Sequence, residues 1–158
     1  MAKINWMYLC DYAYKDVAGK TSIIGMFTDI NVLKFPSKYQ QLFTILELEK
    51  LASESFKLEV GLSSPSEQEL SKRIGGDIRP QGDSERLMRV TMIYAFYGIQ
   101  LPEPGEYHLL LFLNEECIHS IPFRVHLLEI KKKAVSVYIY FEKHSNIPFK
   151  LDKSHASL

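Results

Sequence analysis

Apolar and polar residues alternate along two stretches of the chain. Phe56, Leu58, Val60 and Leu62 alternate with polar or small residues, and the same alternation runs through residues 135–141. A period of two is typical of a β-strand with one buried face, because successive side chains point to opposite faces of the sheet. Both stretches are therefore predicted strands.

Six further runs are rich in the β-branched and aromatic residues that strands accommodate well. Short breaks with turn-forming residues such as Gly19, Pro102 and Gly105 separate several of them. Helical turns fit only residues 37–41, residues 67–72 and the C-terminal tail. The six runs cover residues 4–14, 21–32, 42–51, 86–99, 107–114 and 117–127.

This pattern predicts one all-β domain over residues 1–145, followed by a tail at residues 146–158. About eight strands at hairpin spacing favour a single antiparallel β-sandwich, immunoglobulin-like or jelly-roll-like, with two sheets closing on one core. A closed β-barrel is the alternative. Residues 63–85 are polar and rich in turn formers, so we expect them to be the most mobile internal segment, with a short edge strand around residues 72–78.

Two neighbouring runs are apolar on both sides of the predicted strand. Ile93 and Ala95 in one, and Leu110 and Phe112 in the next, lie opposite the side chains that face the core. A short turn joins the two strands, so we expect the two patches to merge into one surface. Large exposed apolar patches are rare on monomers. Another segment of the chain, such as residues 134–142, or a second copy of the protein must then cover this surface, and we expect a homo-oligomer.

Composition excludes several classes of protein. The chain has 158 residues, 46% of them hydrophobic, and its formal net charge is zero, which argues against a generally cationic nucleic-acid or membrane binder. No apolar run reaches the roughly 18–20 residues of a membrane span. The two cysteines, Cys10 and Cys117, are too few for a disulfide framework, so we expect a reducing, cytoplasmic setting.

The histidines are the first candidates for chemistry. Cys117 and His119 form a Cys-x-His pair, which can supply two zinc ligands, but a closed zinc site needs four and the sequence offers no second pair. Alternation in residues 117–127 predicts that the odd positions, His119 included, face the core. His108 and His126 are predicted to face solvent. We therefore interpret all three as structural or surface histidines.

Other catalytic and binding motifs are incomplete. Cys10 lies mid-strand, where a cysteine is typically a small buried hydrophobe. Residues 75–77 read Gly-Gly-Asp and lack the Gly-Lys-Ser/Thr ending of a phosphate loop. The run of three lysines at residues 131–133 is interpreted as a solvated turn, and the aromatic residues as sheet packing. We assign no catalytic, cofactor-binding or metal-binding residue. The acidic residues of the polar segment lack the spacing of a calcium loop: they are Glu67, Glu69, Asp77, Asp83 and Glu85.

Motifs in three stretches of the chain together resemble a known family. Leu-Cys-Asp-Tyr at residues 9–12 is followed by Gly-Lys-Thr-Ser at residues 19–22 and by Gly-Met-Phe at residues 25–27. Pro-Gly-Glu-Tyr at residues 104–107 opens a late strand. The chain is similar over roughly residues 5–127 to a family of uncharacterised bacterial proteins, a domain of unknown function. The resemblance implies a small all-β intracellular domain with no assigned activity.

The sequence thus favours a non-enzymatic binding or assembly module without a cofactor. An unknown protein partner and a second copy of the chain are the expected partners, and neither nucleic acid nor membrane is expected. The alternative is a carbohydrate-binding or small-ligand-binding β-sandwich that uses aromatic side chains.

Overall fold

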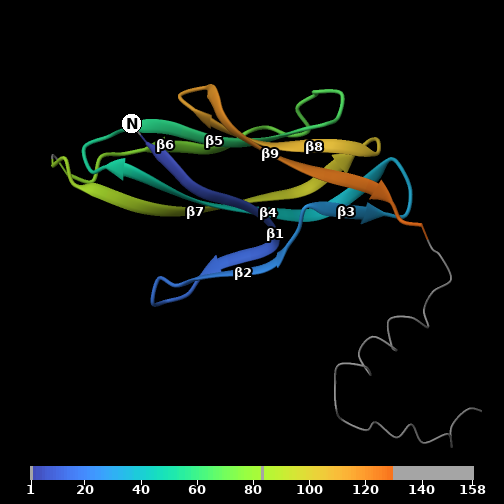
Figure 1. The fold of residues 1–158 in the computed structure, drawn as a ribbon, viewed down its shortest axis with the longest axis horizontal. Helices are drawn as coiled ribbons and strands as arrows, with labels where there is room; N and C mark the ends of the chain where they lie inside the picture. The colour runs from blue at the N-terminus through green and yellow to red at the C-terminus, as the bar shows by residue number, and fades with distance from the viewer. Residues whose placement is uncertain (1, 83, 130–158) are drawn as a thin grey trace, which may run out of the picture. The chain divides into compact units, whose positions relative to one another are not determined.

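The computed structural model describes residues 2–82 and 84–129, and the fold over these residues is all-β (Figure 1). All described strands belong to one compact unit, Met1–Leu128. The strands are β1 (Lys3–Lys15), β2 (Thr21–Met26), β3 (Asp29–Val32), β4 (Ser37–Leu51), β5 (Phe56–Ser63), β6 (Ile74–Ile78), β7 (Leu87–Leu101), β8 (Gly105–Leu113) and β9 (Glu116–Leu127).

These strands form two separate sheets, so the predicted β-sandwich is confirmed. The four-stranded sheet has the order β2-β1-β4-β7, and the five-stranded sheet has the order β3-β9-β8-β5-β6. Each sheet has two open edges, unlike a closed barrel. All pairings are antiparallel except that of β3 with β9, which is parallel.

The alternation in β5 and β8 places one face of each strand in the core between the sheets. Leu58, Val60 and Leu62 are fully buried, as predicted, and so are Leu109 and Leu111 on β8. Burying one such side chain contributes about 1.5–3 kcal/mol relative to leaving it exposed. The inner faces of both sheets therefore supply most of the hydrophobic stabilisation.

A buried tyrosine joins the core to the turn before β8. Tyr107 is fully buried, and its hydroxyl donates a hydrogen bond to the carbonyl of Glu103 at 2.5 Å. The phenol group thus closes the connection between β7 and β8, as corner tyrosines do in other β-sandwiches. Burial raises the pKa of this hydroxyl.

Some strand boundaries differ from the prediction. The run at residues 21–32 is divided between two sheets, because the chain leaves β2 at Phe27 and enters β3 at Asp29. Residues 37–41 belong to β4 rather than to a helical turn, and residues 67–72 are not helical. The edge strand expected around residues 72–78 is confirmed as β6.

The predicted burial of the odd positions of β9 holds only in part, and Leu127 at the end of the strand is 53% exposed. Phe123 and Val125 are buried, whereas Cys117 and His119 are exposed. The pairing of β8 with β9 keeps one register from Gly105↔Val125 to Leu111↔His119 and shifts between His119 and Cys117. A β-bulge thus changes the phase of Cys117, whereas His119 keeps the predicted side of the strand and is nevertheless exposed. A bulge inserts a residue without a partner, and sequence alternation alone does not locate it.

The expectation that two apolar patches merge is wrong. Ile93 and Ala95 lie on β7 in the four-stranded sheet, whereas Leu110 and Phe112 lie on β8 in the five-stranded sheet. The turn between these strands crosses from one sheet to the other, so their outward side chains point away from each other on opposite sides of the sandwich. Each patch has its own cover.

The β1–β2 hairpin covers the patch on β7. Figure 1 shows this hairpin below β4 and β7, and the ammonium of Lys15 near its tip donates to the carbonyl of Thr91 at 2.8 Å. Ala13 and Ile23 of the hairpin pack in one cluster with residues of β4 and β7. The cover thus comes from the same chain, which was one of the two alternatives. It is formed by the β1–β2 hairpin, an element that the sequence did not indicate as a cover. The cluster comprises Cys10, Ala13, Phe43 and Ile45, with Trp6, Ile23, Ile93 and Ala95 packed against it.

A loop residue covers the patch on β8. The guanidinium of Arg73 lies 3.5 Å from the centre of the Phe112 ring, and Phe112 is only 6% exposed. Leu70 and Ile74 of the same polar segment pack against the core. At least the part of this segment next to β6 is therefore attached to the sandwich.

Several predictions fall on residues outside the described ranges. They are the strand at residues 134–142, the three lysines at residues 131–133, the tail at residues 146–158 and the domain boundary at residue 145. Among residues 2–82 and 84–129, no helix has the length and apolar character of a membrane span.

Candidate binding surface

A contiguous row of aromatic rings crosses the outer side of the four-stranded sheet. Tyr97 of β7 contacts Phe43 of β4, with ring centres 6.2 Å apart, and Phe43 contacts Tyr12 of β1 at 4.9 Å. Tyr12 contacts Tyr14 at 5.9 Å. We call these four residues the aromatic strip.

The strand order of this sheet builds the strip. Cys10 of β1 lies opposite Phe43 of β4, and Phe43 lies opposite Ala95 of β7. The small side chains of Cys10 and Ala95 leave room for the Phe43 ring between them. The Phe43 ring then supports Tyr12 and Tyr97 from below, and Phe43 itself is only 6% exposed.

The tyrosines of the strip remain open to solvent. Tyr97 is 69% exposed, Tyr12 44% and Tyr14 42%. Ile24, directly opposite Tyr12 on β2, is 54% exposed and widens the apolar surface. None of the strip residues carries a formal charge at neutral pH. Aromatic side chains, tyrosine among them, are enriched in protein interfaces and often dominate their binding energy.

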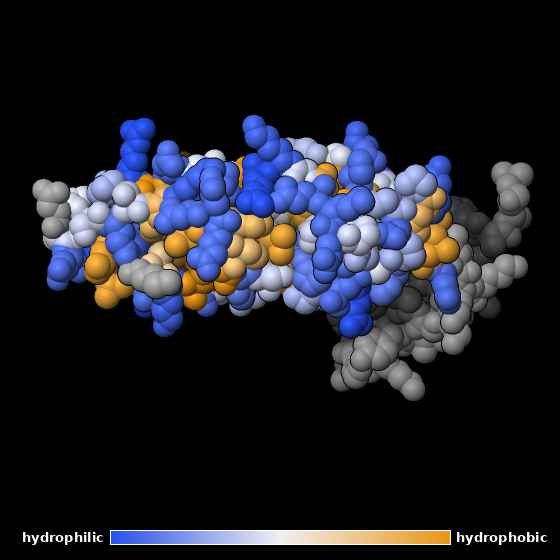
Figure 2. All heavy atoms as spheres, turned by 90° about the horizontal axis from the view of Figure 1, so that it is seen from above, coloured by the Kyte–Doolittle hydropathy of each residue, from blue (hydrophilic) through white to orange (hydrophobic). Residues whose placement is uncertain are grey.

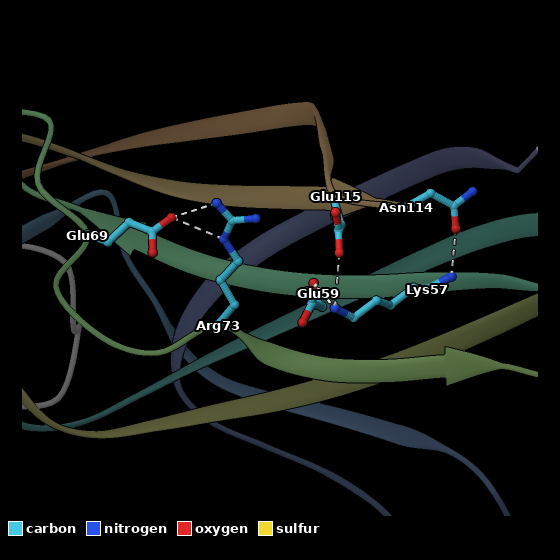
Figure 3. A network of polar contacts seen from close by, with 6 residues as sticks. All are labelled: Lys57, Glu59, Glu69, Arg73, Asn114 and Glu115. Carbon is cyan, nitrogen blue, oxygen red and sulfur yellow. Dashed lines mark hydrogen bonds and ion pairs between the residues drawn. The ribbon is translucent and has the colours of Figure 1, made fainter.

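Figure 2 views the opposite side of the molecule from the five-stranded sheet, where hydrophilic side chains lie beside hydrophobic ones. There Lys57 forms an ion pair with Glu59 at 3.0 Å and lies 3.9 Å from Glu115 (Figure 3). The hydrogen bond from Lys57 to Glu59 raises the pKa of Lys57. The side-chain amide oxygen of Asn114 accepts a hydrogen bond from the backbone N–H of Lys57 at 2.9 Å.

A second ion pair holds the arginine that covers Phe112. Arg73 donates to the same carboxylate oxygen of Glu69 through two nitrogens, at 2.6 and 3.1 Å (Figure 3). The carboxylate fixes the guanidinium over the ring, where a cation–π contact adds about 0.5–1 kcal/mol at an exposed site. These contacts stabilise β5 and β8, and each charged group drawn in Figure 3 has a partner of opposite charge.

The histidines of β8 and β9 have separate polar partners. The ring of His126 bonds the carboxylate of Asp29 at 2.9 Å, because parallel pairing brings β3 beside the end of β9. The Thr28 hydroxyl and then His126 lower the pKa of Asp29. His108 pairs with Glu106 at 3.6 Å. His119 is exposed and faces neither of these pairs.

The candidate metal ligands do not converge. Cys117 donates a weak hydrogen bond to the carbonyl of His119 at 3.7 Å, which fixes the thiol locally. Within residues 2–82 and 84–129, no group of three or more His, Cys, Asp or Glu side chains is placed to hold a metal ion.

Neither the glycine pair nor Cys10 forms a reactive site. Gly75 and Gly76 lie within edge strand β6, and a side chain at Gly75 would collide with the backbone of β5, so this glycine allows two strands to approach closely. Cys10 is fully buried, and burial raises the pKa of its thiol, so the thiolate form that reacts is disfavoured.

A hollow of about 260 Å³ lies next to the strip, beside Asp11 and Gly25, and two others lie away from it. One of about 440 Å³ lies beside Lys57, Asp77 and Arg79, and another of about 270 Å³ lies beside Asp29 and Arg124. These two hollows share no lining residue. The aromatic strip is therefore the best-defined candidate for binding.

The strip was not predicted from the sequence, because its rings come from three strands. The only signal was the alternation of Tyr8, Tyr12 and Tyr14 along β1.

Solved structures that match most of this chain belong to proteins of different kinds. An immunoglobulin-like protein from Pseudomonas aeruginosa is 14% identical, with 80% of this chain and 97% of that chain covered and a TM-score of 0.44. A DNA-bound alkylpurine DNA glycosylase from Pseudomonas fluorescens is 12% identical, with 79% of this chain and 30% of that chain covered and a TM-score of 0.45. A β-glucosidase from Listeria innocua is 8% identical, with 80% and 17% covered and a TM-score of 0.43.

The chain spans less than a third of the length of the DNA glycosylase and of the β-glucosidase. None of the curated proteins compared with the chain matches it. A family model matches residues 5–126, close to the range over which the motifs of the first strand, the hairpin and the late strand resemble such a family. The chain belongs to DUF6941, a family of unknown function.

Proposed function

We propose that this protein is a non-enzymatic binding module that docks a partner protein through the aromatic strip. The observation that carries the proposal is the row Tyr97, Phe43, Tyr12 and Tyr14, in which three tyrosines are 42–69% exposed while their neighbours hold them in place. Rings held in this way lose little conformational entropy on binding.

The geometry of the rings favours a protein partner over a flat sugar. The planes of the exposed neighbours Tyr12 and Tyr14 are inclined by 36°. The buried Phe43 ring is inclined by 67° to Tyr12 and by 82° to Tyr97. A stacking platform for sugar rings requires aromatic planes that lie parallel to one surface. The inclined rings instead form ridges, which suit the irregular apolar groups of a protein surface. Because the strip is uncharged, its partner should present an apolar surface without an unpaired charge.

The polar groups support a non-enzymatic role. Glu59 and Glu69 form ion pairs with Lys57 and Arg73, and the carboxylate of Asp29 forms a hydrogen bond with His126. Lys50 is buried, and its ammonium donates to the carbonyls of Leu51 and Glu54 at 2.8 and 2.9 Å, which is a structural arrangement. We further place the protein in a reducing compartment, because both cysteines are free and Cys117 is exposed.

Site-specific photocrosslinking followed by titration tests the proposal. A photoreactive phenylalanine analogue replaces Tyr97 in one variant and Leu33, which is 71% exposed but off the strip, in the other. The proposal predicts a discrete crosslinked protein from position 97 and none from position 33. The purified partner should then bind wild type and Leu33→Ser equally, and bind Tyr97→Ser at least about tenfold more weakly.

Two results contradict the proposal. One is equal affinity of the partner for wild type and Tyr97→Ser. The other is binding of an oligosaccharide that Tyr97→Ser abolishes, which would establish the carbohydrate alternative instead.

A further inference from the structure

Strand β7 is a long edge that the described part of the chain leaves largely open. It has 15 residues, pairs with β4 on one side and lies at the end of its sheet. The pairing with β4 keeps one register from Ser37↔Leu101 to Leu51↔Leu87. Proteins usually protect long edges with lysines, prolines or bulges in the edge strand. β7 has no lysine and no proline, and its single charge is Arg89.

The contact with Lys15 identifies which backbone groups face outward. The carbonyl of Thr91 accepts the Lys15 ammonium, so this carbonyl points away from β4. In a strand the N–H and C=O of one residue point to the same side, and the side alternates along the chain. Arg89, Ile93 and Ala95 therefore also present their N–H and C=O groups at the open edge.

The other edge strands are short, and β2 and β3 leave parts of β1 and β9 unpaired. β2 has six residues, β3 four and β6 five, two of which are glycines. Short edges offer few hydrogen bonds to a new strand. β7 presents the longest continuous template among the edges of the described sandwich. The open part of β9, residues 116–123, contains Pro122 and a register shift, and the open part of β1, residues 3–9, is shorter. The core-facing side chains Val90, Met92 and Tyr94 of β7 are only half buried.

We propose that β7 of a second copy of this chain pairs antiparallel with this edge. The pairing joins the two four-stranded sheets across a two-fold axis and covers Val90, Met92 and Tyr94 of both copies. A register centred anywhere between Met92 and Ala95 places Arg89 opposite an uncharged residue of the other copy, so no like charges meet. The partner strand replaces the exposed contact of Lys15 with Thr91.

This inference goes beyond the proposed function, because it concerns backbone pairing at an edge and not the aromatic strip. The two proposals are tested separately. A monomeric protein whose partner still depends on Tyr97 would overturn the edge pairing and leave the proposed function intact.

Matched variants of Thr91 test the edge pairing. Thr91→Pro removes one outward N–H and leaves the bonds to β4 in place, which an edge strand tolerates. Thr91→Val keeps the N–H. By sedimentation at micromolar concentration, wild type and Thr91→Val should have twice the mass of 18.3 kDa, and Thr91→Pro should be a folded monomer of that mass. A monomeric wild type, or a dimeric Thr91→Pro, would overturn the proposal.

If Thr91→Pro fails to fold, amide hydrogen exchange on the wild-type protein tests whether β7 pairs with a second copy. In the wild-type protein, the amides of Arg89, Thr91, Ile93 and Ala95 should be protected at high concentration and lose that protection on dilution. The amides of Val90 and Met92, bonded to β4, should stay protected throughout. If the four outward amides exchange fast at every concentration, no second copy pairs there.

Discussion

At the scale of single residues, burial follows the alternation in β5 closely, so the loss of folding stability on substitution can be predicted for each face of the strand. Val60 is fully buried between the sheets, so Val60→Asp places an unpaired carboxylate among apolar side chains and should cost several kcal/mol, a large part of a typical total of about 5–15 kcal/mol. Glu59 on the opposite face pairs with Lys57, and Glu59→Gln should cost under about 1 kcal/mol.

Urea unfolding of the two β5 variants checks this difference. Similar midpoints for Val60→Asp and Glu59→Gln would contradict the assignment of the two faces.

The buried hydroxyl of Tyr107 links stability to alkaline pH. Burial raises the pKa of this phenol in the folded protein, so the unfolded chain releases the proton first. The stabilisation of the folded state by the protonated Tyr107 is therefore complete below the ordinary tyrosine pKa of about 10, and it is lost as the pH rises above that value. Tyr107→Phe should cost about 1 kcal/mol at neutral pH, through the lost bond to Glu103.

Unfolding free energies measured at neutral and alkaline pH test the role of Tyr107. Wild type should lose more stability than Tyr107→Phe as the pH rises past the tyrosine range. An equal loss in both proteins would assign the effect to other groups.

The two thiols should differ in reactivity. Cys117 is exposed and Cys10 is fully buried with a raised pKa, so a thiol reagent should label Cys117 quickly and Cys10 only after unfolding. Mass spectrometry of the native and unfolded protein measures this. A Cys10–Cys117 disulfide in the native protein would contradict both the structure and the reducing compartment proposed for it.

At the scale of elements, the sequence locates strands better than it assigns them to sheets. Alternation predicted β5 and the core face of β8, and turn residues predicted the break before β8. The division of residues 21–32 between two sheets was missed, because residues that favour strands, such as Ile24, Phe27 and Ile30, lie on both sides of the break. Sheet assignment depends on contacts far apart in sequence, such as Lys15 with Thr91, which local patterns do not report.

Gly25 occupies the point where β2 passes the carboxylate of Asp11. Its φ is +64°, and a Cβ there would collide with that carboxylate. Gly19 in the hairpin turn has a φ of +78° with open space around it. Gly25→Ala and Gly19→Ala therefore share the backbone strain of about 1–2 kcal/mol, and only Gly25→Ala adds a steric clash.

The two alanine variants thus separate strain from packing. Thermal unfolding should place Gly25→Ala below Gly19→Ala, and Asp11→Ala should restore part of the loss in the Gly25→Ala background. Equal melting temperatures for the two single variants would show that Asp11 moves aside at no cost.

At the scale of the whole molecule, the two outer faces of the sandwich differ in character. Ion pairs and Arg73 cover the apolar groups of the five-stranded sheet, whereas the β1–β2 hairpin covers those of the four-stranded sheet and leaves tyrosines exposed above them. Sequence reasoning recognised that two strands needed a cover. It did not identify the aromatic strip, because Phe43, Tyr12 and Tyr97 meet only once β1, β4 and β7 are adjacent.

Nitration of tyrosines in intact cells and in the purified protein tests the binding role of the strip most directly. Tyr97 and Tyr12 should react readily in the purified protein and be protected in cells, where the partner is present. Tyr8 is the control, because it is 42% exposed, close to the 44% of Tyr12, and stacks on Trp6 outside the strip. The account predicts equal nitration of Tyr8 in both samples. Equal nitration of Tyr97 and Tyr12 in both would contradict it.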